Sequence, residues 1–197
     1  RAIHQALQES VQRRRDLADG PAGVLLSGGL DSSLLVGLLA EQGVKDIRTF
    51  SIGFEDQPEE SVNEFEFSDQ VVEMYNTRHQ KIVIPNEQVL KRLPEAIGQM
   101  AEPMVGQDAV AFYLLAEQVS KDVKVVQSGQ GADEVFAGYF WYTQMAAASG
   151  SDVERFANHY FDRDPAEILE TVAEKYRGED STSQRVDELL NEADTAT

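Results

Sequence analysis

The chain has 197 residues, of which 42% are hydrophobic, and this fits one globular domain with or without an appended helical piece. The 35 acidic residues against 17 basic ones give a formal net charge of −18. This charge excludes a general nucleic-acid binder, because such proteins need a basic surface to neutralise phosphates. The absence of cysteine excludes disulfides, thiolate metal sites and a cysteine nucleophile within these residues.

No apolar stretch approaches the length needed to span a bilayer, and the first five residues, Arg-Ala-Ile-His-Gln, lack a signal-peptide pattern. We therefore expect a cytoplasmic protein with no nucleic-acid or membrane partner. The chain begins with Arg1 instead of Met, which is typical of an excised fragment.

Apolar periodicity predicts helices alternating with strands over the first 127 residues. The predicted helices cover residues 3–18, 34–43, 62–76, 87–100 and 108–120, and the predicted strands cover 24–26, 47–54, 81–84 and 123–127. Pro94 is expected to interrupt the fourth helix or to start it afresh, and Asp108 to cap the fifth. This alternation predicts a doubly wound α/β domain, with a mainly parallel sheet and helices on both faces.

The composition changes near residue 150, after which the chain is acidic, helical and poor in motifs. Asp164-Pro165 and Asp180-Ser181 are typical helix starts. We therefore divide the chain into a domain over residues 1–150 and an acidic helical extension of the same domain over residues 151–197.

A loop at the end of the first predicted strand has the residues needed to bind phosphates. Its sequence is Ser27-Gly28-Gly29-Leu30-Asp31-Ser32-Ser33. Backbone N–H groups at a helix N-terminus bind oxyanions, glycines allow close approach, and the serines add hydroxyl donors. The Asp31 carboxylate would repel a phosphate unless a divalent cation lay between them, so the loop implies Mg²⁺-bound phosphates. The alternative is a tight strand-to-helix turn with serine caps.

A second loop follows the fourth predicted strand, and it presents another carboxylate, Asp133. In doubly wound sheets, ligands bind beyond the carboxyl ends of the strands, so both loops are candidates for one shared site. Two carboxylates facing one triphosphate can hold Mg²⁺ jointly. The alternative for Asp133 and Glu134 is a helix N-terminal cap.

The first loop resembles the PP-loop, Ser-Gly-Gly-x-Asp-Ser-Ser, of the ATP pyrophosphatases, which cleave ATP between its α and β phosphates. The segment from Ser128 to Tyr139 resembles Ser-Gly-Glu-Gly-Ala/Ser-Asp-Glu-x-Phe-Gly-Gly-Tyr of asparagine-synthetase-type enzymes. The resemblance covers about residues 20–142 and implies an adenine nucleotide alpha hydrolase-like fold, with ATP and Mg²⁺ as cofactors.

By the same resemblance, Asp31 and Asp133 hold Mg²⁺ and Leu26 and Ile52 flank the adenine. The nucleotide also contacts the first loop, which includes Ser27, Gly28, Gly29, Ser32 and Ser33, and the second loop at Ser128 and Gly129.

The chain departs from asparagine synthetases at Gln130, where their loop carries Glu. A neutral glutamine side chain cannot act as a general base. The surrounding segments, including Ala101–Val105, resemble N-acetylglutaminylglutamine amidotransferases, so the expected acceptor is aspartate or N-acetylglutaminylglutamine. Glu102 either lies near that acceptor or is a solvated loop acid.

The resemblance implies a synthetase domain of a glutamine-dependent amidotransferase. Such an enzyme adenylates a carboxylate and uses ammonia to form the amide. Its expected partners are the carboxylate substrate, ammonia and an N-terminal glutaminase domain, and a homodimer is also possible by this resemblance. The family continues past Thr197 with a basic segment that has no match here, so we expect a truncated fragment that binds nucleotide but turns over poorly or not at all.

Two alternative functions remain, that of a tRNA-modifying PP-loop enzyme and that of a non-catalytic nucleotide-binding scaffold.

Two further residues stand out in the sequence. We interpret His79 as a structural residue and Trp141 as a packing residue.

Overall fold

The computed structural model describes residues 1–55, 65–102 and 108–194. They form two compact units, Arg1–Gln130 and Gly131–Thr197. The predicted boundary near residue 150 rests on composition and stays a prediction. Within the described residues, no helix is both long and apolar enough to cross a membrane.

The first unit contains a four-stranded parallel sheet in the order β3-β2-β1-β4. The strands are β1 (Ala22–Leu25), β2 (Arg48–Phe54), β3 (Arg78–Ile84) and β4 (Val125–Gln127). The chain moves outward from β1 through β2 to β3 and then returns to the other side of β1. The sheet is therefore doubly wound, as predicted, and its switch point lies between β1 and β4.

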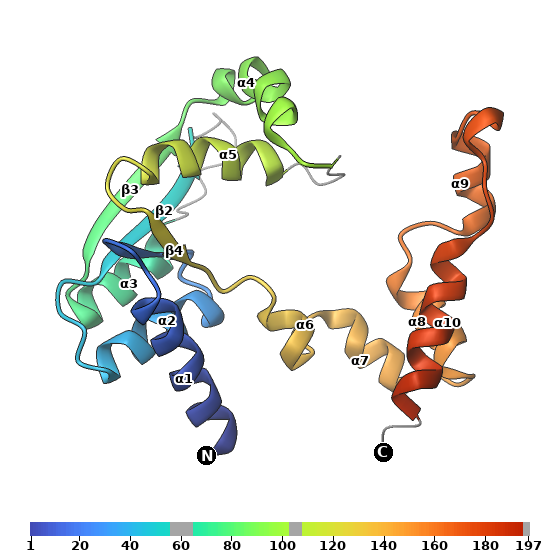
Figure 1. Cartoon of the computed structure of the whole chain (residues 1–197), viewed down its shortest axis with the longest axis horizontal. Helices are drawn as coiled ribbons and strands as arrows, with labels where there is room; N and C mark the ends of the chain where they lie inside the picture. Colours follow the sequence, from blue (N-terminus) through green and yellow to red (C-terminus); the bar gives the residue numbers. More distant parts are fainter. Residues whose placement is uncertain (56–64, 103–107, 195–197) are drawn as a thin grey trace. The chain divides into compact units, whose positions relative to one another are not determined.

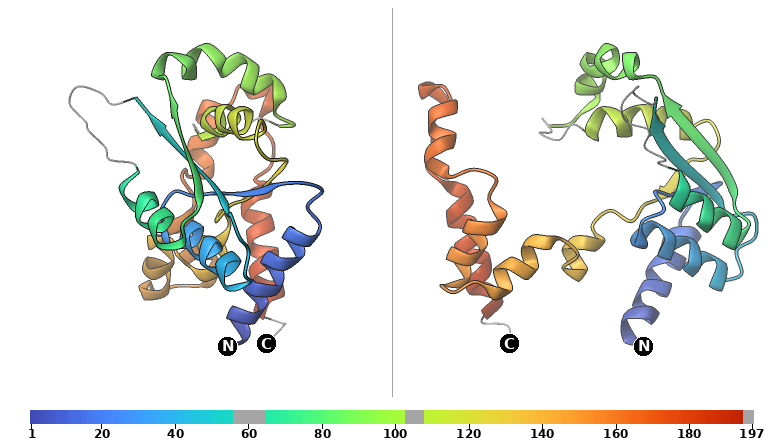
Figure 2. Two further views of the ribbon diagram at one scale, coloured as in Figure 1. Left: turned by 90° about the vertical axis from the view of Figure 1, so that its left-hand side faces the viewer. Right: turned by 180° about the vertical axis from the view of Figure 1, so that it is seen from behind.

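Five helices cover the two faces of this sheet (Figures 1 and 2). They are α1 (Ala2–Asp16), α2 (Leu30–Glu41), α3 (Glu66–Tyr75), α4 (Asn86–Gln99) and α5 (Asp108–Val119). The first three pack on one face and the last two on the other, which confirms the predicted helices on both faces.

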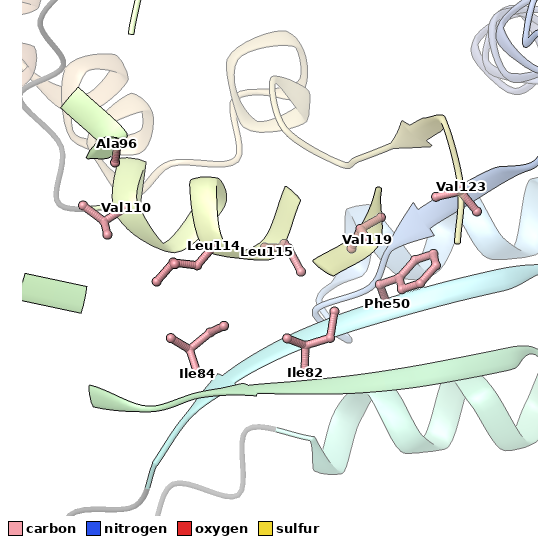
Figure 3. Packing of buried hydrophobic residues seen from close by; sticks show 9 residues of the cluster. All are labelled: Phe50, Ile82, Ile84, Ala96, Val110, Leu114, Leu115, Val119 and Val123. Carbon is pink, nitrogen blue, oxygen red and sulfur yellow. The ribbon is translucent and has the colours of Figure 1, made fainter. Parts of the chain in front are cut away.

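Each face has its own hydrophobic core, because the side chains of a strand alternate between the faces. Val24 and Leu26 pack with residues of α1 and α2, including Val36 and Leu38. Figure 3 shows the other core, in which α5 lies over β2 and β3. Its residues are Phe50, Ile82, Ile84, Ala96, Val110, Leu114, Leu115, Val119 and Val123. A parallel sheet buried on both faces explains why β1 reads as an apolar run.

Several predicted boundaries differ from those of the structure. The strand predicted over residues 81–84 begins at Arg78, because its polar first half also pairs with β2. The helix predicted from residue 34 begins at Leu30, because Asp31 and the serines form its first turn. The predicted start of a helix at residue 62 lies outside the described residues. So do residues 103–105, which belong to the segment that resembles N-acetylglutaminylglutamine amidotransferases.

The prediction that Pro94 interrupts a helix was wrong, because α4 continues through it. A proline leaves the carbonyl four residues earlier, here that of Leu90, without its helical partner. Leu90 is 78% exposed, so water can reach this part of the helix. At α5, the helix does begin at Asp108, but the side chain that would cap it lies outside the described residues.

The second unit is helical, as predicted. Its elements are α6 (Ala132–Phe136), α7 (Phe140–Ala147), α8 (Asp152–Tyr160), α9 (Pro165–Thr171), the 3-10 helix η1 (Glu174–Tyr176) and α10 (Ser181–Asp194). Asp164 caps α9 by accepting a hydrogen bond from the Ala166 N–H at 2.7 Å, which confirms that predicted helix start. In the described part of this unit, no residue is fully buried.

Candidate functional site

The first candidate loop joins β1 to α2 and leaves the N-terminus of that helix uncapped. Gly29 is the N-cap residue, and no side chain caps the helix there. The first N–H groups of a helix have no partner within it, and they lie at the positive end of the helix dipole. This end of α2 can therefore bind an oxyanion.

The serine hydroxyls bond within the loop and hold its shape. Ser32 is 6% exposed, and its Oγ accepts from the Ser27 N–H at 3.2 Å and lies 3.0 Å from the Ser27 Oγ. The Gly29 N–H donates to the Ser27 Oγ at 3.2 Å, and the Ser33 Oγ donates to the Gly29 carbonyl at 2.7 Å. The predicted donation of these hydroxyls to a bound anion stays a prediction.

The two loop glycines have different surroundings. Gly28 has a φ of +86°, and a Cβ on it would lie 2.5 Å from the Phe67 carbonyl carbon and overlap the Ser68 nitrogen. Gly28 is therefore required by the close approach of α3. For Gly29, the nearest atom to such a Cβ is the Ser27 Oγ at 3.4 Å, so its open side is free to receive a ligand.

The second loop lies directly beside the first. Strands β1 and β4 are parallel neighbours, with Val24 opposite Gln127, so both loops begin at the same, C-terminal, end of the strands. Gly129 packs against the first turn of α2, where a Cβ on it would lie 2.8 Å from the Asp31 Cβ and 2.9 Å from the Ser32 nitrogen. The prediction that the two loops share one end of the sheet is confirmed.

The predicted adenine neighbours, Leu26 and Ile52, lie on opposite faces of the sheet. Leu26 is 1% exposed and belongs to the core with α1 and α2, whereas Ile52 packs against the core with α4 and α5. The reason is the register, which pairs Leu25 with Phe50 and so aligns Leu26 with Ser51. Their joint contact with an adenine stays a prediction. The placement of the two side chains on opposite faces of the sheet does not favour it.

Asp133 lies in the first turn of α6, in the second unit. The predicted meeting of Asp31 and Asp133 at one Mg²⁺ therefore stays a prediction. Within the second unit, the Gly138 N–H donates to the Asp133 carbonyl at 2.9 Å. A Cβ on Gly138 would overlap the Asp133 carboxylate, so a larger residue there would have to displace that side chain.

Ala137 is the C-cap residue of α6 and adopts the left-handed conformation, with a φ of +54°. This conformation costs an L-residue about 1–2 kcal/mol, and glycine usually occupies it. The asparagine-synthetase-type segment has glycine at the corresponding place. In this chain an alanine, Ala137, therefore adopts a backbone conformation that suits glycine better.

Glu134 accepts a hydrogen bond from the Tyr139 hydroxyl at 2.9 Å. This bond to the carboxylate favours the protonated phenol and raises the pKa of Tyr139 to about 12. The Tyr139 ring stacks on Trp141 at 4.1 Å, and Trp141 also contacts Tyr160 of α8 edge-on. These contacts support the interpretation of Trp141 as a packing residue.

Gln130 is exposed and ends the first unit, and Glu102 is exposed just beyond the end of α4. The residues after Glu102, 103–107, lie outside the described ones, so its predicted place near the acceptor stays a prediction.

His79 lies near the start of β3, whereas the two loops follow the C-terminal ends of their strands. Its Nδ1 is 2.9 Å from the Thr49 Oγ1, and burial lowers its pKa. Its buried Nε2 has no hydrogen-bond partner in the described structure. These surroundings support a structural role for His79.

No group of three or more acidic or histidine residues that could hold a metal ion occurs in the part of the chain that the structure describes. Mg²⁺ in proteins is usually held by one or two carboxylates together with substrate phosphates. Asp31, half-buried in the first turn of α2, fits that arrangement. The loop therefore suits Mg²⁺ that arrives with a phosphate ligand.

Sequence reasoning missed two contacts that shape the site. One is the approach of α3 to Gly28, and the other is the hydrogen bond from the Ser51 Oγ to the Leu26 carbonyl. Both join residues at least 25 positions apart, so no local pattern signals them.

A glycine- and serine-rich loop at an uncapped helix N-terminus, at the switch point of a doubly wound sheet, is typical of phosphate-binding α/β proteins. The family model for asparagine synthase matches residues 2–195, nearly the whole chain. The chain therefore belongs to the asparagine synthase family, as its sequence motifs predicted.

Curated relatives support this assignment. Asparagine synthetase [glutamine-hydrolyzing] 1 from Bacillus subtilis (strain 168) is 32% identical over 142 residues, which are 72% of this chain and 22% of that protein. Asparagine synthetase [glutamine-hydrolyzing] from Cricetulus griseus is 29% identical over 158 residues, which are 75% of this chain and 27% of that protein. The chain thus spans about a quarter of the length of these relatives.

Among solved structures, the chain is similar to an NH3-dependent NAD synthetase from Campylobacter jejuni subsp. jejuni NCTC 11168 in complex with a nitrate ion. The sequence identity is 20% and the TM-score is 0.48, and the match covers 99% of this chain and 83% of that one.

Proposed function

We propose that this chain is the ATP-using, amide-forming part of a glutamine-dependent synthetase. The observation that supports the proposal best is the contact of Gly129 with Asp31, because it joins the two family motifs at the switch point of the sheet. Membership of the asparagine synthase family supports the same reaction class.

The proposed reaction has two steps. A carboxylate oxygen of the acceptor attacks the α-phosphorus of ATP, which gives an acyl-adenylate and releases pyrophosphate. Ammonia then attacks the acyl carbon, loses a proton and displaces AMP, which leaves the amide. The expected source of ammonia is glutamine, hydrolysed by an N-terminal glutaminase domain.

In this proposal the protein mainly positions reactants and neutralises charge. The uncapped N–H groups of α2 and the open side of Gly29 receive phosphate oxygens. Asp31 and Asp133 would hold Mg²⁺, and the metal would supply positive charge for the pyrophosphate. Ser128 and Gly129 contact the nucleotide from the second loop.

The proposed acceptor is aspartate or N-acetylglutaminylglutamine. The similarity to asparagine synthetases favours aspartate, whereas the neutral Gln130 favours a different acceptor from that of the enzymes with Glu there. Measuring AMP release with each acceptor in turn distinguishes the two.

ATP–pyrophosphate exchange in the full-length protein tests the proposed reaction. We expect Asp31→Ala to lower exchange about a hundredfold or more, the usual scale for losing a key electrostatic group. Asp19→Ala is a matched control, because it removes the same charge from an exposed residue outside the loop. Near-normal exchange in Asp31→Ala would contradict the proposal, and failure of the unmodified protein to bind Mg·ATP would favour a scaffold domain.

A further inference from the structure

The outer side of β3 carries backbone groups that no described strand pairs with, because β3 lies at the edge of the sheet. The Arg78 N–H donates to the Ile47 carbonyl at 2.8 Å, and β3 then pairs with β2 through Ile84. The backbone groups of successive residues point to opposite sides of a strand. The N–H and C=O groups of His79, Lys81 and Val83 therefore point outward, as a template for another strand.

Two hollows follow β3 along its length. One, of about 220 Å³, is lined by Arg48 and Arg78 near the start of the strand. The other, of about 460 Å³, extends to the end of the strand and lies over Ile82, Ile84 and Leu114, which are all buried. Gln80 lines both hollows, so they adjoin each other. Together they offer space for side chains of an extended segment.

The first hollow is lined by two arginines and one acidic residue, Asp122, so its net charge is positive, in contrast to the −18 of the whole chain. Arg48 and Arg78 are register partners on neighbouring strands and lie on the same face of the sheet. Over the described ranges, neither guanidinium has a carboxylate within ion-pairing distance, and Arg48 donates to the Asp122 carbonyl at 2.8 Å. Like charges placed opposite each other repel, so an acidic group between them would be stabilised.

We propose that β3 binds an extended acidic segment of a partner protein, which adds a strand to the open edge. Backbone hydrogen bonds to His79, Lys81 and Val83 would hold the segment. An acidic side chain would enter the hollow at Arg78. An apolar side chain four residues away, on the same face, would lie over Ile82, because side chains alternate along a strand.

A second copy of this chain is a poorer occupant of the same edge. Antiparallel pairing of two β3 strands over their full length would place Arg78 of one copy opposite Ile84 of the other, so neither Arg78 would meet an acidic side chain. Lys81 is already ion-paired with Asp69 at 2.7 Å, so it is Arg78 that favours an acidic partner segment.

The first test uses the full-length protein and a fluorescein-labelled peptide of about nine residues. The peptide has the sequence Thr-Glu-Thr-Gln-Thr-Val-Thr-Val-Thr, and a second peptide has the reversed sequence. We expect saturable binding of one direction by fluorescence anisotropy. We also expect slower hydrogen exchange at the amides of His79, Lys81 and Val83, with little change at Gln80 and Ile82. Absence of saturable binding up to about 1 mM, or binding without this alternating protection, would overturn the proposal.

Two variants test the backbone and charge contributions. Val83→Pro removes an outward N–H and leaves the ladder with β2 in place, so binding should be lost, whereas Val83→Thr should retain it. Arg78→Glu should weaken binding about tenfold. Its control, Arg163→Glu, makes the same charge change at an exposed residue of the second unit.

If Val83→Pro fails to fold, Arg78→Glu and the exchange pattern still decide. Unchanged binding in Arg78→Glu would overturn the proposal. So would dimerisation of the full-length protein that depends on Val83 and excludes the peptide.

Discussion

Gly129 packs on Asp31 so closely that the two residues leave no space for a side chain between their loops. A Cβ on Gly129 would lie 2.8 Å from the Asp31 Cβ, well inside normal contact distance. The second loop is thereby held against the first turn of α2. A glycine that sequence analysis assigned to nucleotide contact thus also has a structural role.

We expect Gly129→Ala to separate the two loops. The added methyl group must displace Asp31 or the Ser32 backbone, and such overpacking usually costs about 1–3 kcal/mol. Denaturant unfolding should report this loss, and affinity for Mg·ATP should fall with it. Gly98→Ala is the matched control, because no atom of the described structure lies within 4 Å of a Cβ there. It should leave stability unchanged or raise it by about 0.5–1 kcal/mol. Equal stability of the two variants would contradict the close packing at Gly129.

Gly28 and Gly29 should respond differently to the same substitution. Gly28→Ala places a methyl group into the backbone of α3 and forces alanine into a positive φ, so we expect a loss of about 2–4 kcal/mol. Gly29→Ala meets no backbone atom and should fold normally, but its methyl group would occupy the space expected for a phosphate. Calorimetry should then show at least about tenfold weaker binding of Mg·ATP. A Gly29→Ala protein with unchanged affinity would show that phosphates bind elsewhere.

Ala137→Gly should stabilise the second unit. Ala137 has a φ of +54°, and glycine adopts this conformation without the steric penalty, so we expect a gain of about 1 kcal/mol. The control is Ala148→Gly, at a residue with a φ of −77° and a ψ of 151°, where glycine should destabilise by about 0.5–1 kcal/mol. Thermal unfolding followed by circular dichroism measures both. Changes of the same sign in the two variants would argue against a strained Ala137.

Acidification should destabilise the first unit through His79. Burial holds the pKa of His79 below the value of about 6.5 expected in the unfolded chain. The unfolded state therefore binds the proton more tightly, and the free energy of unfolding falls as the pH drops below about 6.5. His79→Asn should reduce this dependence between pH 7.5 and 5 in a series of urea titrations. An identical pH dependence in both proteins would show that His79 does not titrate as described.

The order of the strands and helices could be predicted from the sequence because each element has its own apolar period. The apolar run at Val24–Leu26 and the loop after it identified the first strand and its switch from strand to helix. Boundaries were less predictable where polar residues belong to an element, as in the first half of β3 and the first turn of α2. Pairing with β2, not local preference, fixes the start of β3.

The candidate loops could also be predicted, but the reason for each glycine could not. Gly28 was assigned to phosphate contact and Gly129 to nucleotide contact, yet each faces protein atoms from a distant part of the chain. The assignment of Leu26 and Ile52 to one adenine depended on register, which pairs Leu25 with Phe50 and is invisible in either strand alone. Composition and spacing identify the residues of such a site more readily than the face on which each one lies.

The hydrogen bonds among Ser27, Ser32 and Ser33 and the backbone of Gly29 have a consequence for the kinetics of binding. They order the loop during folding, so a ligand that docks on α2 does not have to immobilise it. The association rate should then be governed by diffusion and by the repulsion between an anionic nucleotide and a chain of net charge −18. For this protein, added salt should speed nucleotide capture, since it screens that repulsion.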